Sequence, residues 1–66
     1  MKIGENIKYL MKSKNLTQNA LAHMLNVKQN TVSQWVNEIN EPNCETILKL
    51  CEILDTTPNE ILGWED

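Results

Sequence analysis

The sequence predicts an all-α protein, a compact five-helix bundle that forms a single domain over residues 1–66. Three observations favour this class. Apolar residues recur at helical spacing along nearly the whole chain, and no segment alternates apolar and polar residues for long enough to form a strand. No Asn-Gly or Asp-Gly pair is present to form a tight β-hairpin turn. A chain of 66 residues also has room for one small core and no more.

The first two helices are expected over residues 3–13 and 17–25. In the first, apolar residues at i, i+4, i+7 and i+8 share one face, and they are Ile3, Ile7, Leu10 and Met11. The second is expected to begin with the hydroxyl of Thr17 as its N-cap and to end at a left-handed Asn26. Its buried side is expected to contain Ala20, Leu21, Met24 and Leu25, with Leu16 and Val27 packed in the flanking turns.

Three further helices are expected over residues 29–37, 43–54 and 58–62. The buried stripe of the third consists of Val32, Trp35 and Val36, and a loop that ends at Pro42 follows it. Asn43 is expected to cap the fourth, whose inner face is Ile47, Leu50, Cys51 and Leu54. For the fifth, Thr57, Pro58 and Glu60 match the N-cap, first-turn proline and reciprocal acid of a full capping box, and Gly63 ends the helix.

Charge is divided unequally along the chain. The net charge is −3, which by itself argues against binding to nucleic acid. Residues 1–37, however, carry five Lys against one Glu, a net of +4, whereas residues 38–66 carry one Lys against eight acids, a net of −7. We call these the basic and the acidic segment. No arginine is present.

Several classes of protein are disfavoured. No apolar run approaches the roughly 18 residues of a membrane span, and the first residues do not form a secretory signal. Cys44 and Cys51 lie about 10.5 Å apart along one predicted helix, too far for a disulfide. His23 is isolated and expected at the surface, so no zinc-binding spacing exists. Three acids of the fourth helix region, Glu45, Glu52 and Asp55, are expected to form a solvated face. We therefore expect a cytoplasmic non-enzyme with no cofactor, no metal, no membrane contact and no small-molecule ligand.

The second and third helices are joined by a tight turn, which is the arrangement of a helix-turn-helix. The outer face of the third helix is polar and carries no acid, although the chain is rich in acids; it consists of Lys28, Gln29, Asn30, Ser33, Gln34 and Asn37, with Thr31 intermediate. A polar outer face is common to surface helices. Amide side chains can, however, pair with adenine in the major groove, and the missing acids favour that role.

The chain resembles the lambda-repressor-like helix-turn-helix family, which includes the Cro and phage-repressor DNA-binding domains and the xenobiotic-response-element type regulators of bacteria. The resemblance covers about residues 3–63. It is carried by Leu16-Thr17-Gln18, Leu21-Ala22, Leu25-Asn26-Val27, Thr31-Val32-Ser33-Gln34-Trp35, Pro42, Ile47-Leu48-Lys49-Leu50 and Ile61-Leu62-Gly63.

This resemblance implies two sets of DNA contacts and a core role for Trp35. The residues that match base-reading positions are Lys28, Gln29, Asn30, Thr31 and Gln34. Those assigned to the DNA backbone are Gln18, Ser33, Asn37, Asn40, Lys12 and Lys14. Gln18 would hold a phosphate near the N-terminus of its helix, and Asn37 and Asn40 belong to a loop that packs against the sugar-phosphate chain.

The chain departs from the family pattern at several positions. Asn26 and Glu38 stand where relatives usually have Gly, and the charge of Glu38 is expected to repel phosphate. Lys28 replaces the usual Ser or Thr N-cap of the third helix. Met11 and Val36 together replace an Arg–Glu pair, and replacing both partners of a buried pair by apolar residues is often neutral. We therefore expect Met11 and Val36 to touch.

The resemblance implies a sequence-specific transcriptional regulator, a repressor of phage or bacterial type. It would bind a near-palindromic operator in double-stranded DNA as a homodimer, with half-sites about 34 Å apart. The alternative is a protein-interaction module that keeps the fold without binding DNA. The sequence leaves open whether a further domain follows. If none does, dimer contacts would come from the fourth and fifth helices and Trp64, whose indole either folds back on the core or joins a subunit contact.

Overall fold

The computed structural model describes residues 2–64, and the regular structure in this range is entirely helical. The helices are α1 (Ile3–Ser13), α2 (Gln18–Leu25), α3 (Gln29–Val36), α4 (Cys44–Leu54) and α5 (Pro58–Leu62). The predicted all-α class and the positions of all five helices are confirmed. The predicted bounds differ at three helix ends by one residue each, and in each case that residue is the cap.

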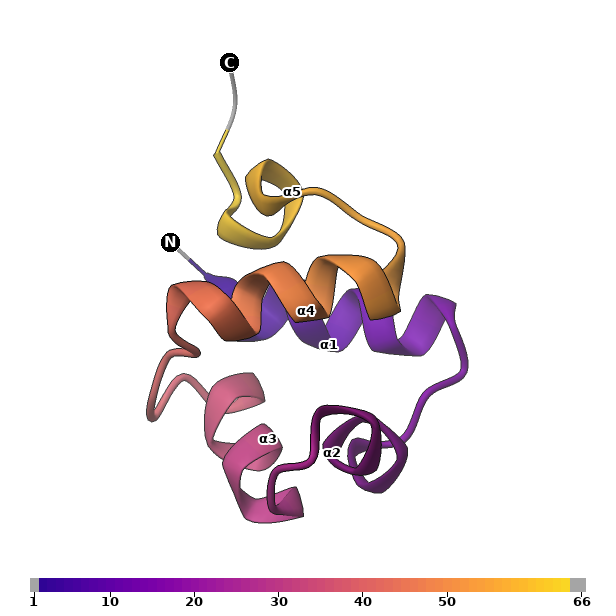
Figure 1. Ribbon diagram of the computed structural model, residues 1–66. Helices are drawn as coiled ribbons and strands as arrows, with labels where there is room; N and C mark the ends of the chain where they lie inside the picture. The colour runs from indigo at the N-terminus through magenta and orange to yellow at the C-terminus, as the bar shows by residue number, and fades with distance from the viewer. Residues whose placement is uncertain (1, 65–66) are drawn as a thin grey trace.

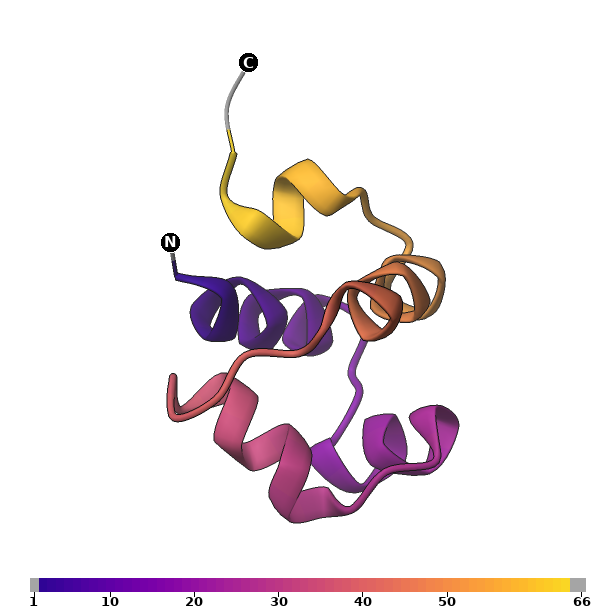
Figure 2. The same cartoon turned by 60° about the vertical axis from the view of Figure 1, so that its left-hand side comes forward.

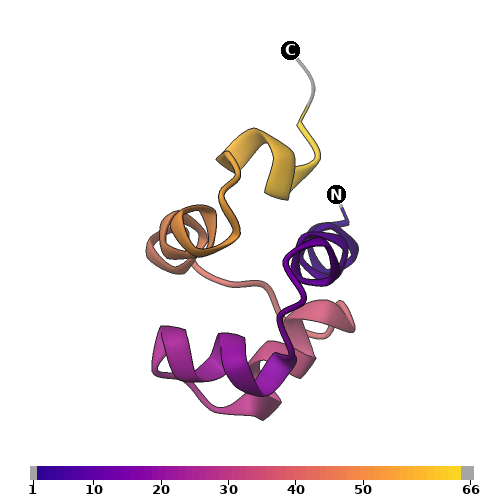
Figure 3. The same ribbon diagram turned by 90° about the vertical axis from the view of Figure 1, so that its right-hand side faces the viewer.

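The helices surround a single core between α1 and α4. Figure 1 shows α2 and α3 at one end of the molecule and α5 at the other, and Figure 3 shows α1 and α4 end-on, on opposite sides of the core. α1 packs against α3 and α5, α4 packs against α2 and α5, and α2 packs against α3. The helix-turn-helix formed by α2 and α3 therefore packs against both long helices, α1 and α4.

The core contains residues from every helix. The most deeply buried side chains are Ile7, Leu21, Val32, Leu50, Leu54 and Ile61. Met11 and Val36 are both buried in the same cluster, and α1 packs on α3, so both apolar replacements lie in the shared core. Direct contact between these two side chains stays a prediction.

Two predicted core residues of the second helix were wrong: Ala20 is half-buried and does not belong to the core cluster, and Met24 is exposed. Met24 is 54% exposed, whereas Ala22, only 4% exposed, is buried in its place. The buried stripe of α2 is formed by Leu21, Ala22 and Leu25. Met24 lies about 100° around the helix from the centre of that stripe. Because α2 packs against both α3 and α4, the small side chain of Ala22 suits the crowded side.

The three predicted N-caps are confirmed. Thr17 Oγ1 accepts from the Ala20 N–H at 3.0 Å, Asn43 Oδ1 from the Thr46 N–H at 2.9 Å, and Thr57 Oγ1 from the Glu60 N–H at 3.3 Å.

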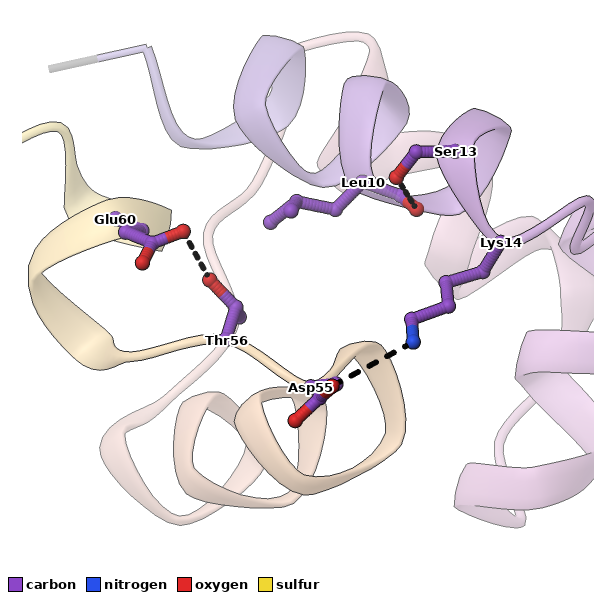
Figure 4. Close-up of polar contacts among 6 residues, drawn as sticks. All are labelled: Leu10, Ser13, Lys14, Asp55, Thr56 and Glu60. Carbon is purple, nitrogen blue, oxygen red and sulfur yellow. Dashed lines mark hydrogen bonds and ion pairs between the residues drawn. The ribbon is translucent and has the colours of Figure 1, made fainter.

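The full capping box predicted for the fifth helix is wrong. The carboxylate of Glu60 does not return to the Thr57 N–H but accepts a hydrogen bond of 2.8 Å from the Thr56 hydroxyl (Figure 4). The hydroxyl one residue earlier is a donor within reach of the same carboxylate, and it takes the place of the backbone N–H.

Candidate nucleic-acid interface

The turn between α2 and α3 has the geometry that the helix-turn-helix requires. Asn26 adopts the left-handed conformation, with φ 57° and ψ 44°, as predicted for an Asn in the place of a Gly. The N–H groups of Asn26 and Val27 donate to the carbonyls of His23 and Ala22, which closes the end of α2. Lys28 has an extended backbone, and its side chain, which has no hydrogen-bond acceptor, does not cap the start of α3.

The outer face of α3 is exposed most fully at its N-terminal end. Lys28, Gln29 and Asn30 are exposed, whereas Thr31, Ser33 and Gln34 are half-buried. Val32, Trp35 and Val36 are buried, which confirms the predicted inner stripe and the core role of Trp35. Figure 2 shows α3 along the lower edge of the molecule, beyond α1 and α4. The first turn of α3 therefore offers its polar side chains to solvent.

A hydrogen bond joins the first residues of the two helices. Gln29 Nε2 donates to Gln18 Oε1 at 2.7 Å. An amide nitrogen carries two hydrogens, so Gln29 keeps a second donor and its own carbonyl oxygen, the pair needed to bind N7 and N6 of adenine. Gln18 keeps its Nε2 donors, which lie at the N-terminal end of α2, where helix N–H groups favour an anion. The bond thus orients a candidate base-reading residue and a candidate phosphate ligand together.

The C-terminal half of α3 is tied to the following loop. Asn40 Nδ2 donates to Gln34 Oε1 at 2.9 Å, and Asn37 Nδ2 donates to Ser33 Oγ at 3.2 Å. The Asn40 bond occupies one acceptor position of Gln34 and leaves its Nε2 donors for a partner. The structure therefore brings four of the predicted contact residues into two hydrogen-bonded pairs at the C-terminal end of α3.

The lysines assigned to DNA differ in their surroundings. Lys12 is exposed in the last turn of α1, and Lys28 is exposed beside α3. Lys14 instead points toward the α4–α5 connection, where its Nζ lies 3.7 Å from Asp55 Oδ2 (Figure 4). The Lys14 side chain is 44% exposed and that of Asp55 88%, so water screens the pair, its contribution to stability is small, and a phosphate can compete for the lysine. DNA contact by Lys12, Lys14 and Lys28 stays a prediction.

A family model described as a Cro/C1-type helix-turn-helix DNA-binding domain matches residues 6–66. The chain belongs to this family. The chain is 38% identical over 65 residues to the HTH-type transcriptional regulator DicA of Escherichia coli K12. This match covers 97% of the chain and 48% of DicA. It is 32% identical over 66 residues to the transcriptional activator BcrR of Enterococcus faecalis, covering 100% of the chain and 32% of BcrR. It is 35% identical over 60 residues to repressor protein C2 of Salmonella phage P22, covering 91% of the chain and 28% of C2.

A solved structure has the same fold as this Cro/C1-type domain. The crystal structure of the restriction-modification controller protein C.AhdI of Aeromonas hydrophila matches with a TM-score of 0.82 and 28% identity, covering 91% of both chains. The relatives are transcriptional regulators, not enzymes. The chain spans about half the length of DicA and a third or less of the other two curated relatives.

Within residues 2–64 the structure brings together no group of three or more His, Cys, Asp or Glu residues that would hold a metal ion. Across the same range, no helix is both long and apolar enough to cross a bilayer. His23 is exposed and Cys51 is buried, as the sequence predicted; Cys44 is exposed, and both thiols are free. Burial raises the pKa of the Cys51 thiol, and the nearby Glu60 carboxylate raises it further.

Two features of this Cro/C1-type domain were missed by sequence reasoning. One is the Gln18–Gln29 bond, for which the signal is two glutamines on either side of a helix-turn-helix turn. The other concerns Glu38, whose charge was expected to face phosphate. Its carboxylate instead accepts a hydrogen bond from the Glu5 N–H at the start of α1. The backbone of Glu38 is left-handed, with φ 62°, a conformation that Gly adopts without strain, and its side chain has a partner that sequence spacing did not reveal.

Proposed function

We propose that the protein is a sequence-specific DNA-binding repressor whose α3, the recognition helix, lies in the major groove. The observation that carries this proposal is the acid-free first turn of α3, where the exposed Gln29 is oriented by Gln18. α2 would cross the DNA backbone, with Gln18 on a phosphate and the loop of residues 37–40 beside the sugar-phosphate chain. The regulator would act in the cytoplasm, where bacterial and phage DNA is transcribed.

Base recognition would depend on amides. Gln29 and Asn30 are suited to adenine, Lys28 is the main candidate for guanine, and Thr31 and Gln34 complete the base-reading set. Since the chain has no arginine, it lacks the side chain most often used to bind guanine in two places. Selection of bound duplexes from a random pool should therefore give a consensus rich in A·T pairs. A G·C-rich consensus would contradict this assignment.

We further propose that two copies bind a near-palindromic operator, with half-sites about one helical turn, 34 Å, apart. The domain measures 33 × 23 × 20 Å, so two copies side by side can place their recognition helices on one face of a duplex at that spacing. Apolar side chains for self-association are exposed outside the helix-turn-helix: Leu48 on α4 is 60% exposed, Tyr9 on α1 71%, and Trp64 beyond α5 63%. Sedimentation with and without operator duplex tests this proposal, and a 1:1 complex on a palindrome would contradict it.

Repression and activation are separated by a reporter experiment. A phage repressor and a transcriptional activator are both among the relatives. With the selected site placed across a promoter, we expect the protein to lower transcription, because a bound domain covers the DNA that RNA polymerase needs. A rise in transcription would show an activator that uses the same DNA contacts.

The second candidate, a protein-interaction module, is favoured by the net charge of −3. Retention on random duplex at low salt separates the two functions. Binding that weakens steeply with added salt is expected for the DNA-binding regulator. Passage through the column at all salt concentrations would favour the interaction module.

A further inference from the structure

Glu38 follows the C-cap of α3 and turns its side chain back toward α1. Its backbone φ is 62°, a left-handed conformation that residues with a side chain seldom adopt. Its Oε1 accepts a hydrogen bond of 3.0 Å from the backbone N–H of Glu5. Glu5 is the third residue of α1, so this N–H is one of the first four in the helix, which have no partner within it.

The start of α1 lacks a local cap. Lys2 occupies the N-cap position and makes no side-chain hydrogen bond to the helix. A carboxylate at a helix N-terminus satisfies a free N–H and interacts favourably with the helix dipole. Glu38 therefore provides, from 33 residues away, the contact that a Ser, Thr or Asp N-cap usually provides.

Gly4 makes this contact sterically possible. It is buried although it lies in the first turn of α1. A Cβ at this position would overlap the Trp35 carbonyl oxygen and Glu38 Oε1. The first turn of α1 can thus approach the end of α3 and the Glu38 carboxylate only because residue 4 has no side chain.

The other side of the loop is held by α3. The Ile39 N–H donates to the Gln34 carbonyl at 2.9 Å, and Asn40 Nδ2 donates to the Gln34 side chain at 2.9 Å. The loop of residues 37–40 is therefore fixed from two directions, by α3 through Gln34 and by α1 through Glu38. Each contact restricts the conformations open to this loop.

We propose that Glu38 is a positioning residue for DNA binding. Its carboxylate caps α1, which holds the 37–40 loop in the conformation that meets the DNA backbone. The cap also directs the negative charge onto a helix N-terminus instead of onto phosphate. The inference rests on the proposed DNA-binding function, because the loop needs a phosphate partner for its position to matter.

Variants that change either the charge or the length of the Glu38 side chain, but not both, test this role. Glu38→Asp keeps the charge and tolerates a left-handed backbone, but its carboxylate is one methylene too short to reach the Glu5 N–H. Glu38→Gln loses the charge but keeps an oxygen at the same distance. Glu41→Gln, which removes an exposed acid from the same connection, is the control for charge alone.

We expect Glu38→Asp to bind the selected duplex about fivefold more weakly, the change that corresponds to one lost capping bond. Glu38→Gln should bind as tightly as Glu41→Gln. If Glu38 acts only as a repelling charge, Glu38→Asp will match the wild type and Glu38→Gln will bind more tightly than Glu41→Gln. Either of these results would overturn the proposal.

Amide hydrogen exchange of Glu5, measured without DNA, tests the cap separately. Exchange at Glu5 should be about fivefold or more faster in Glu38→Asp and close to wild type in Glu38→Gln, with core amides unchanged in both. Equal exchange rates of the Glu5 amide in the wild type and both variants would show that Glu38 does not cap α1, while leaving the proposed function standing. A wild-type protein that binds no duplex, with the exchange pattern intact, would instead overturn the proposed function and with it the positioning role.

Discussion

The basic and acidic segments differ in charge and in what they present to solvent, yet they share one core. The basic segment contains α1, α2 and α3, and the exposed first turn of α3 carries amides and a lysine. The acidic segment contains α4 and α5, with Glu45, Glu52 and Asp55 exposed; its last two acids, Glu65 and Asp66, lie outside the described residues. The net charge of a small domain is therefore a poor guide to its partner. What matters is which element each charge lies on, since acids distant from the recognition helix also disfavour DNA bound in the wrong orientation.

The largest effect should come from a change that tests whether the two segments are one folding unit. Leu50 on α4 is fully buried, so Leu50→Ala should lower the free energy of unfolding by about 2–5 kcal/mol. Urea unfolding in a Trp64→Phe background, followed by Trp35 fluorescence and by circular dichroism, measures this change. Leu48→Ala, at an exposed position of the same helix, should change stability by about 0.5 kcal/mol or less. Loss of helix before the Trp35 signal changes would contradict a single shared core.

The next effect tests whether specificity belongs to the basic segment. Gln29→Ala should cost about 1–3 kcal/mol of discrimination at one base pair of the selected site, with little change in affinity for random duplex. Binding competition between the selected site and single-base variants measures the effect. Asn59→Ala removes an exposed amide from α5 in the acidic segment and should leave discrimination unchanged. Similar losses of discrimination in the two variants would contradict the assignment of specificity to the first turn of α3.

A smaller effect tests whether contact between lysine and phosphate, which does not depend on the DNA sequence, belongs to the basic segment. Lys12→Gln, at an exposed residue of α1 assigned to the DNA backbone, should weaken binding to all duplexes and reduce the slope of log affinity against log salt by about 0.9, the value for one phosphate contact. Lys49→Gln is the matched change in the acidic segment, where the ammonium lies 3.5 Å from the Glu45 carboxylate and on α4. We expect no change in slope for that variant. Equal slopes for the two variants would contradict the assignment of phosphate contact to the basic segment.

The smallest effect distinguishes the two faces of α4 within the acidic segment. Burial raises the pKa of the Cys51 thiol, with Glu60 adding to the shift, whereas Cys44 is exposed. Since the thiolate is the nucleophile, iodoacetamide at mildly alkaline pH should modify Cys44 first and leave Cys51 protected until the protein unfolds. Mass spectrometry of the time course gives both rates. Rapid modification of Cys51 in the native protein would show that α4 opens away from the core.

Much of the fold was predictable because its determinants are local. Helical spacing predicted all five helices, and the short polar side chains of Thr17, Asn43 and Thr57 predicted the starts of α2, α4 and α5. Asn26 was predictable in the left-handed turn because its side chain tolerates that conformation. Met24 was assigned wrongly because the apolar pattern of α2 fits two stripes. The choice between them depends on where α3 and α4 pack.

In the candidate site too, local features were predictable from the sequence and contacts between elements were not. Residue type and spacing identified the helix-turn-helix and its exposed amides, but the hydrogen bonds that orient them join different elements. Gln18 meets Gln29 across the turn, Asn40 meets Gln34 across the loop, and Glu38 meets the start of α1. Helical periodicity does not encode these contacts, because the first and third depend on how two helices are placed and the second on the conformation of the loop after α3.

The sequence by itself thus determined five helices, the N-caps of α2, α4 and α5, the polar surface of α3 and the separation of charge, since each of these follows from residue types and spacing along the chain. The tertiary structure decided which polar groups pair, where the charge of Glu38 is directed and why residue 4 has to be glycine. Those outcomes follow from packing, which brings residues as far apart as Glu5 and Glu38 within hydrogen-bonding distance and leaves no space for a Cβ between α1 and the end of α3.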